Sequence, residues 1–134
     1  MPAFKLDIVT PERTVYSARI QSLRAPGSEG GFGVLPRHAA MLAALEIGPL
    51  SFVEEEGDSQ RRMAISGGFA EVLGDSVTIL AETAEFAEEI DPERAREARD
   101  RALERLAQAQ KIDEARARAA LARALNRLKV ATEN

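Results

Sequence analysis

The spacing of apolar residues along the chain changes near residue 90. Before that point, apolar and polar residues alternate in short stretches, as where Lys5 and Asp7 separate Phe4, Leu6 and Ile8. A period of two is typical of a strand with one buried face. After residue 90 the chain has no glycine and a single proline, and apolar residues recur every three or four positions, which is typical of a helix. The pattern therefore predicts an α+β chain, mainly β in its first part and helical in its second.

Glycines and prolines divide the first part into short strands. Residues 69–73 and 76–81 flank Gly74-Asp75, a favourable pair for a tight hairpin turn. Gly67-Gly68, just before them, predicts a bulge or a close backbone approach. Many short strands with frequent turns favour a small sandwich or barrel over alternating strands and helices. We therefore expect a β domain at residues 1–84.

The second part contains two apolar stripes at helical spacing. They consist of Ala95, Ala98, Ala102, Leu106 and Ala109, and of Ala117, Leu121, Ala124, Leu125 and Leu128. A short polar connection separates the stripes, and Asp113 can cap a second helix. We expect an antiparallel two-helix hairpin at residues 91–134, with a linker at residues 85–90. Its alanine-rich seam buries little apolar area, so the hairpin should open at a cost of only a few kcal/mol, roughly.

The first helix has a well-marked start at Asp91-Pro92. An Asp side chain can accept from the free N–H groups of the first turn, and Pro at the first helical position lacks a donor that would have had no partner. If the hairpin turns near residue 110 or 111, Arg94 lies opposite Arg127, and Arg123 shares a helix face with Arg127. Three guanidinium groups beside Asp91 suit a polyphosphate, whose oxygens match their planar forks.

An alternative interpretation is that these arginines are solvated and paired with glutamates on the same helix. Glu97 and Arg101 have the i,i+4 spacing of such pairs, and so do Glu114 and Arg118. The helix pattern alone leaves both interpretations open.

Composition excludes several classes of site. The chain has no Cys and one histidine, His38, which excludes disulfides, thiol catalysis and a histidine metal cluster. No nucleophile or orienting carboxylate stands near His38 in the sequence, so we expect a structural or interface role for it. The acidic residues between Glu85 and Asp91 do not have the spacing of a calcium loop, and they suit a helix start instead. We predict no catalytic residues and no metal site.

Charge and hydropathy argue against nucleic acid as a partner and against insertion into a membrane. The net charge is −4; residues 1–88 carry 7 basic and 13 acidic residues, and residues 89–134 carry 11 and 9. Such a distribution argues against nucleic-acid binding. No apolar run approaches the roughly 20 residues that span a bilayer, and the start lacks a signal-peptide core. We expect a soluble, intracellular protein that can dock on a membrane complex without inserting into the membrane.

Five short segments occur in an order that resembles one protein family. They are residues 7–12 (DIVTPE), 33–38 (GVLPRH), 65–72 (ISGGFAEV), 77–80 (VTIL) and 125–128 (LNRL). Together they resemble the epsilon subunit of bacterial and chloroplast F-type ATP synthase from end to end. The resemblance implies a ten-stranded β-sandwich followed by a helical hairpin. It also implies a non-catalytic rotor subunit on the cytoplasmic side of the bacterial plasma membrane.

The resemblance further implies partners and a role in regulation. The sandwich would bind the gamma subunit and the membrane c-ring, and so couple proton flow to ATP synthesis. The helices, when extended, would reach the alpha and beta subunits and restrain ATP hydrolysis. In the c-ring loop, the corresponding residues are Gly31, Phe32, Arg37 and His38. This loop departs from the common pattern, because Phe32 replaces a frequent Leu, Gly31 an acidic residue, and Arg37 a glycine.

Some members of the family bind ATP through a motif Ile/Leu-Asp-x-x-Arg-Ala. In this chain the motif is matched by Ile90, Asp91, Arg94 and Ala95, and the family's other ligand positions correspond to Glu85, Arg123 and Arg127. The resemblance thus implies ATP as a possible regulatory ligand and no required cofactor. The alternative function is a free-standing nucleotide-binding protein, or a β-sandwich ligand-binding protein or enzyme with a helical oligomerisation tail.

Overall fold

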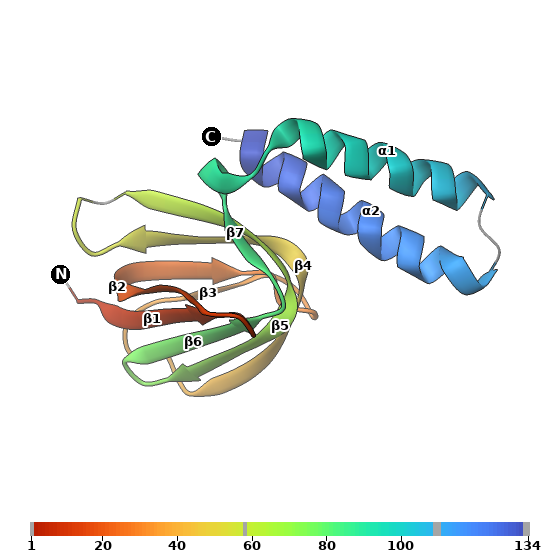
Figure 1. Cartoon of the computed structure of the whole chain (residues 1–134). Helices are drawn as coiled ribbons and strands as arrows, with labels where there is room; N and C mark the ends of the chain where they lie inside the picture. The colour runs from red at the N-terminus through yellow and green to blue at the C-terminus, as the bar shows by residue number, and fades with distance from the viewer. Residues whose placement is uncertain (1, 58, 109–110, 133–134) are drawn as a thin grey trace. The chain divides into compact units, whose positions relative to one another are not determined.

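The computed structural model describes residues 2–57, 59–108 and 111–132. These residues form two compact units, Met1–Phe86 and Ala87–Asn134. The first unit contains all the described strands and the second contains the helices (Figure 1). The predicted order, a β-rich part followed by two helices, is confirmed.

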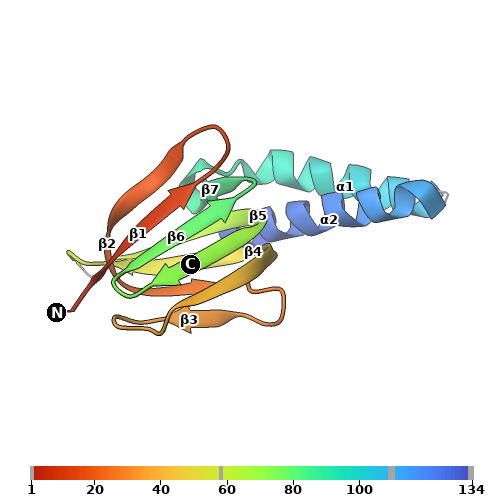
Figure 2. The same cartoon turned by 90° about the horizontal axis from the view of Figure 1, so that it is seen from below.

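The described residues of the first unit form seven strands. They are β1 (Phe4–Val9), β2 (Thr14–Ala25), β3 (Phe32–Val34), β4 (Met41–Glu54), β5 (Gln60–Leu73), β6 (Ser76–Ala81) and β7 (Ala84–Phe86). The sheet runs β1-β6-β5-β4-β2-β3, and β7 pairs with β5. Strand β1 pairs in parallel with β6 and antiparallel with β2, so five strands close into a barrel (Figures 1 and 2). Closure leaves only the short strands β3 and β7 outside the ring.

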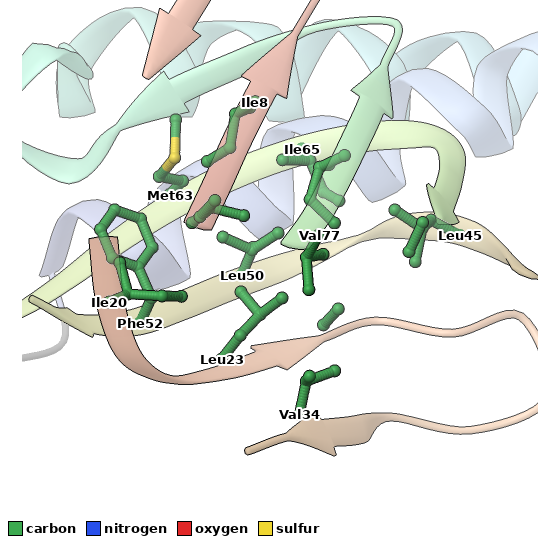
Figure 3. Packing of buried hydrophobic residues seen from close by; sticks show 14 of the residues in the cluster. Ile8, Ile20, Leu23, Val34, Leu45, Leu50, Phe52, Met63, Ile65 and Val77 are labelled. Atoms are coloured by element: carbon green, nitrogen blue, oxygen red, sulfur yellow. The ribbon is translucent and has the colours of Figure 1, made fainter. Parts of the chain in front are cut away.

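The core of the barrel is aliphatic and follows the alternation of the sequence. Ile8 of β1, Leu23 of β2, Leu50 of β4, Ile65 of β5 and Val77 of β6 are at most 1% exposed and point into one interior (Figure 3). Because five strands contribute to the same cluster, its burial holds the ring together.

The structure has seven strands in the first unit where ten were expected. The three longest strands each serve two parts of the sheet, which accounts for the difference. In β5, residues 63–65 pair with β7 and residues 68–73 pair with β6, on either side of Gly67. Gly67 and Gly68 have φ values of +80° and +131°, so the chain bends there without ending the strand. Of the two alternatives predicted at Gly67-Gly68, the close backbone approach is present, because an ideal Cβ at Gly68 would lie 1.9 Å from the Leu80 carbonyl oxygen. The register to β4 is the same on both sides of the pair, and the strand continues through it.

The second unit consists of a short 3-10 helix, η1 (Ala87–Glu89), and two α-helices, α1 (Pro92–Gln108) and α2 (Lys111–Thr132). The α-helices lie side by side and antiparallel (Figures 1 and 2). Their buried alanines are Ala95 and Ala102 on α1, and Ala117 and Ala124 on α2. Each pair is seven residues apart, which is two helical turns, so one narrow seam runs along both helices.

Three details of the predicted hairpin need correction. Leu125 was expected in the seam but is 47% exposed, because it follows the seam residue Ala124 and is turned about 100° away from it. Residues 85–90, expected as a linker, include part of β7 and all of η1. Asp113, expected as a cap, lies inside the first turn of α2, which begins at Lys111. The predicted seam residue Ala109 lies outside the described residues.

Candidate functional site

The start of α1 has the capping geometry that the sequence predicts. The Asp91 side chain accepts hydrogen bonds through Oδ1 from the backbone N–H of Glu93 at 3.0 Å and of Arg94 at 3.4 Å. The Ala95 N–H donates to the Asp91 carbonyl at 3.1 Å and begins the helical ladder. Asp91 and Arg94 are both exposed. The motif residues at positions 90–95 therefore form an ordered helix start.

The seam register brings the three candidate arginines to one region of the hairpin. The seam alanines occur at matching distances from the turn, so Ala95 lies at the level of Ala124 in the antiparallel pair. Arg94 and Arg123 each precede one of these alanines by one residue. In antiparallel helices that relation places both on the same side of the seam. Arg127 lies one turn further along α2 on that side and is half-buried.

The remaining candidate residues have different surroundings. Ile90 is 7% exposed, and its N–H donates to the Ala87 carbonyl at 3.3 Å. Glu85 belongs to the first unit, where it is half-buried in β7 opposite Ala64 of β5. Ala95, at 2% exposure, is part of the seam, so its small side chain allows the helices to approach closely.

A groove of about 760 Å³ runs along the arginine side of the hairpin. Residues of both helices line it: Arg105, Gln108, Asp113, Arg116, Ala117, Ala120 and Arg123. Of the predicted nucleotide residues, only Arg123 is among them. Sequence reasoning missed Arg105 and Arg116, although each lies one turn or less from a seam alanine. A helical projection of both stripes would have found them.

Some of the helix arginines form ion pairs within their own helix, as the alternative interpretation of these residues predicts. Arg118 donates to Glu114 at 2.6 Å, as the i,i+4 spacing predicts, and Arg99 contacts Asp100 at 3.0 Å. The expected pair of Glu97 and Arg101 is not formed within the described part of the chain. Some helix arginines are therefore locally paired, whereas the arginines that line the groove form no ion pair within the described residues.

The four residues expected at the c-ring lie just before, in and after β3. Phe32 pairs with Ala25 of β2 and packs against the core, and Gly31 before it is exposed. Arg37 is exposed with φ of +66°, a left-handed conformation at a turn. Next to it, His38 lies half-buried, with its Nδ1 2.8 Å from the Ala39 carbonyl. The four residues thus lie within one short segment, with Phe32 in β3 and Arg37 and His38 in the turn that follows it.

An exposed apolar row crosses three neighbouring strands of the barrel. Leu42 of β4 is 71% exposed, Phe69 of β5 is 52% exposed, and Leu80 of β6 is 50% exposed. Phe69 is paired with both Ala44 and Leu80 across the strands. The tight turn at Gly74-Asp75 fixes the pairing of β5 and β6 and places Phe69 opposite Leu80, so this turn is the signal in the sequence that predicts the row.

A second feature that sequence reasoning missed is a polar and aromatic cluster around Tyr16. The Tyr16 hydroxyl donates to Glu54 Oε2 at 2.9 Å, and Arg61 lies 3.5 Å from the same oxygen. The Arg61 guanidinium also lies 4.2 Å from the centre of the Phe86 ring, and the Tyr16 ring packs 4.6 Å from that of Phe52. Burial and the hydrogen bond to Glu54 raise the pKa of Tyr16 to about 12. This cluster stabilises one end of the barrel.

Within the described residues, no group of three or more His, Cys, Asp or Glu side chains is arranged to hold a metal ion. A search of the same residues finds no helix with the length and hydropathy needed to cross a membrane.

Comparisons with known proteins agree with a β-rich unit and a helical unit of one family. Residues 3–87 match the family described as ATP synthase, Delta/Epsilon chain, beta-sandwich domain. Residues 88–132 match ATP synthase, Delta/Epsilon chain, long alpha-helix domain. The chain therefore belongs to the ATP synthase delta/epsilon chain family, and the resemblance predicted from its sequence is confirmed.

Its similar curated relatives are ATP synthase epsilon chains. It is 46% identical over 108 residues to the ATP synthase epsilon chain of Brevibacillus brevis, covering 81% of each chain. It is 53% identical over 104 residues to that of Syntrophobacter fumaroxidans, covering 78% of this chain and 76% of the relative. A chain in the Euglena gracilis mitochondrial ATP synthase, in a structure of OSCP, F1 and c-ring, matches 91% of this chain and 77% of its own length. Its TM-score is 0.82 at 26% identity.

Proposed function

We propose that this chain is the epsilon subunit of a rotary ATP synthase and acts as a non-catalytic part of the central stalk. The observation that carries the proposal is that both units match the two domains of one family, with almost no residue left over. In this role the β-rich unit binds the gamma subunit and the c-ring, and transmits rotation during proton-driven ATP synthesis. The subunit then works at the cytoplasmic side of the bacterial plasma membrane.

The exposed apolar row of Leu42, Phe69 and Leu80 is the surface that we assign to the gamma subunit. Three large apolar side chains on adjacent strands are unfavourable in water, and burial against a partner recovers their hydrophobic free energy. An aromatic residue at the centre of such a row is the typical anchor of an interface.

A binding assay with purified gamma subunit tests this assignment. Phe69→Ser should weaken binding by roughly tenfold, because it removes the central anchor. Leu103→Ser is the matched control, since Leu103 is 48% exposed but lies on α1. Equal affinity of wild type and Phe69→Ser would exclude the row as the interface, while failure of the wild type to bind gamma at all would overturn the proposed function.

For the c-ring, the proposed contact is the loop with Gly31, Phe32, Arg37 and His38. Arg37 is exposed and holds a left-handed turn, so it presents its charge outward. Arg37→Glu should reduce retention of the subunit on c-ring-containing membranes, and Arg13→Glu, an exposed arginine before β2, serves as the control. Equal retention of both variants would argue against this loop.

The helical unit is proposed to restrain ATP hydrolysis by extending toward the alpha and beta subunits. Its alanine seam supports this role, because alanines bury little area and the two helices can separate at a modest cost. Removal of residues 89–134 should raise the ATPase rate of the reconstituted complex. An unchanged rate with and without nucleotide would remove the inhibitory role and leave the rotor role intact.

We also propose that the folded hairpin binds ATP as a regulatory ligand. Arg94, Arg123 and Arg127 would contact the phosphates, with Asp91, Ile90, Ala95 and Glu85 completing the site by family correspondence. The three arginines lie within about one helical turn of one another on one side of the seam, which supports this proposal. A ligand held by both helices favours the folded hairpin only by the difference between its affinities for the folded and extended states.

Calorimetric titration of the full chain with ATP tests the nucleotide site. Arg94→Ala and Arg127→Ala should each weaken binding, whereas Arg118→Ala, which is paired with Glu114 away from these arginines, should not. Absence of heat at millimolar ATP would overturn the ATP site without affecting the rotor role.

A further inference from the structure

We infer that the groove near the turn of the hairpin is a second anion site, which binds a linear triphosphate group. This groove, defined by Arg105, Gln108, Asp113, Arg116, Ala117, Ala120 and Arg123, shares only Arg123 with the proposed nucleotide site. The inference does not depend on ATP binding at the start of α1 or on a role in ATP synthase.

The charges of the groove favour a multiply charged anion. Three arginines line it and one carboxylate, Asp113, stands among them. None of the three arginines has an ion pair within the described part of the chain, in contrast to Arg118 on the other side of α2. Three arginines that line one groove without ion-pair partners give it a positive potential, which a bound anion neutralises.

The shape of the groove favours a chain of phosphates rather than a compact anion. Arg116 and Arg123 are seven residues apart on α2, about 10 Å along the helix, and Arg105 lies across the seam on α1. Ala117 and Ala120 form a floor of small side chains between them, so a ligand can lie low between the helices. The planar guanidinium forks can each bind phosphate oxygens in a bidentate manner, and the Gln108 amide adds a neutral donor.

The opposite side of the hairpin supplies matched controls. On α2, Arg118 is two residues from Arg116 but is paired with Glu114 and does not line the groove. On α1, Arg99 contacts Asp100 and is likewise absent from the groove. Arg99→Gln is the control for Arg105→Gln on α1, and Arg118→Gln is the control for Arg116→Gln on α2. Each control removes one positive charge from the same helix as its groove variant, but outside the groove.

The test is a calorimetric titration of the full chain with inorganic triphosphate, at low and at physiological salt. Wild type should bind saturably, with weaker binding at the higher salt because the groove is open to solvent. Arg105→Gln and Arg116→Gln should each reduce the affinity by roughly fivefold, the scale of one exposed charge pair, whereas Arg99→Gln and Arg118→Gln should change it by less than twofold. Circular dichroism at 222 nm checks that each variant keeps its helices.

A second arm identifies the source of the triphosphate and separates this site from the nucleotide site. Competition by ATP, with no competition by adenosine, would show that the groove also accepts the triphosphate of a nucleotide. If only Arg94→Gln and Arg127→Gln weaken triphosphate binding, the anion is held at the start of α1 and the inference is overturned. It is also overturned if wild type shows no saturable binding at millimolar triphosphate, or if the control variants lose as much affinity as the groove variants.

Discussion

Gly68 is the position where one added methyl group should do the most damage to the barrel. Its φ is +131°, and an ideal Cβ there would lie 1.9 Å from the carbonyl oxygen of Leu80 and 2.9 Å from the Cα of Ala81. Both neighbours are backbone atoms of β6, and Gly68 is itself paired with Ala81. No rotation of a flexible side chain can relieve this contact.

The expected loss for Gly68→Ala follows from how far β6 must move. Real Cβ atoms essentially never approach within 3.0 Å of another atom, so the Leu80 carbonyl would have to shift by about 1 Å. Such a shift weakens the β5–β6 ladder, at about 1 kcal/mol per hydrogen bond, and repacks the core side of β6, at about 1–3 kcal/mol. The positive φ adds about 1–2 kcal/mol for a residue with a side chain. We expect a total loss of about 3–6 kcal/mol in the free energy of unfolding.

Gly30→Ala is a matched control for the backbone conformation. Gly30 has a similar φ of +126°, but nothing lies within 4 Å of its ideal Cβ. This variant should lose only the conformational part, about 1–2 kcal/mol. The difference between the two variants therefore measures the clash with β6.

Urea unfolding followed by tyrosine fluorescence is a suitable assay. Tyr16 is the only tyrosine, the chain has no tryptophan, and Tyr16 lies in the barrel, so the signal reports the β-rich unit and not the helices. The reasoning would be refuted if both variants had the same unfolding midpoint. Failure of Gly68→Ala alone to fold would agree with its larger expected loss.

Three further predictions concern both units. The pKa of Tyr16 is raised to about 12 from its ordinary value of 10.0, so its stabilising contribution is complete below pH 10 and is lost as the pH rises to 12. Tyr16→Phe should therefore unfold with a smaller pH dependence over that interval, measured by circular dichroism in urea; an equal dependence would contradict the shift. Asp91→Ala should destabilise the first turn of α1 by about 1 kcal/mol and Asp91→Asn by much less, measured by hydrogen exchange of its amides. If the amides of Asp91→Ala were as well protected as those of the wild type, the cap would contribute little to stability. Ala102→Leu should lower the melting temperature at 222 nm, since overpacking a 2% exposed seam position costs about 1–3 kcal/mol, whereas Leu103→Ala on the exposed face should change it little. A larger decrease in melting temperature for Leu103→Ala than for Ala102→Leu would contradict the assignment of Ala102 to the seam.

Much of the fold could be predicted from local signals. The alternation through Phe4, Leu6 and Ile8 predicted strand β1 because one face of that strand is buried throughout. Asp91-Pro92 predicted the start of α1 because a cap acts through its own neighbours in sequence. The pairing of Glu114 with Arg118 was predictable for the same reason.

The periodicity of a helix predicts which residues of the candidate site share a face of that helix, but not which residues of the two helices lie next to each other. The spacing of Arg123 and Arg127 places them on one face of α2, and an assumed turn brought Arg94 to their level. The groove with Arg105 and Arg116 needed the actual seam, which depends on which alanines of the two helices pack together. The spacing of Leu125 fits a helical stripe, yet Leu125 is 47% exposed and the preceding residue, Ala124, is the one buried in the seam.

The sequence by itself determined the division into strands and helices, the helix cap and the family, because each depends on residues close in the chain or on motifs in order. Only the tertiary structure decided that β1 joins both β6 and β2 and so closes the barrel, since long-range pairing follows from shared burial and not from local spacing. It also decided that Gly67 and Gly68 bend β5 instead of ending it, and that Tyr16 meets Glu54 and Arg61. In each case the deciding contact joins residues that lie far apart in the sequence or depends on the space that other strands leave.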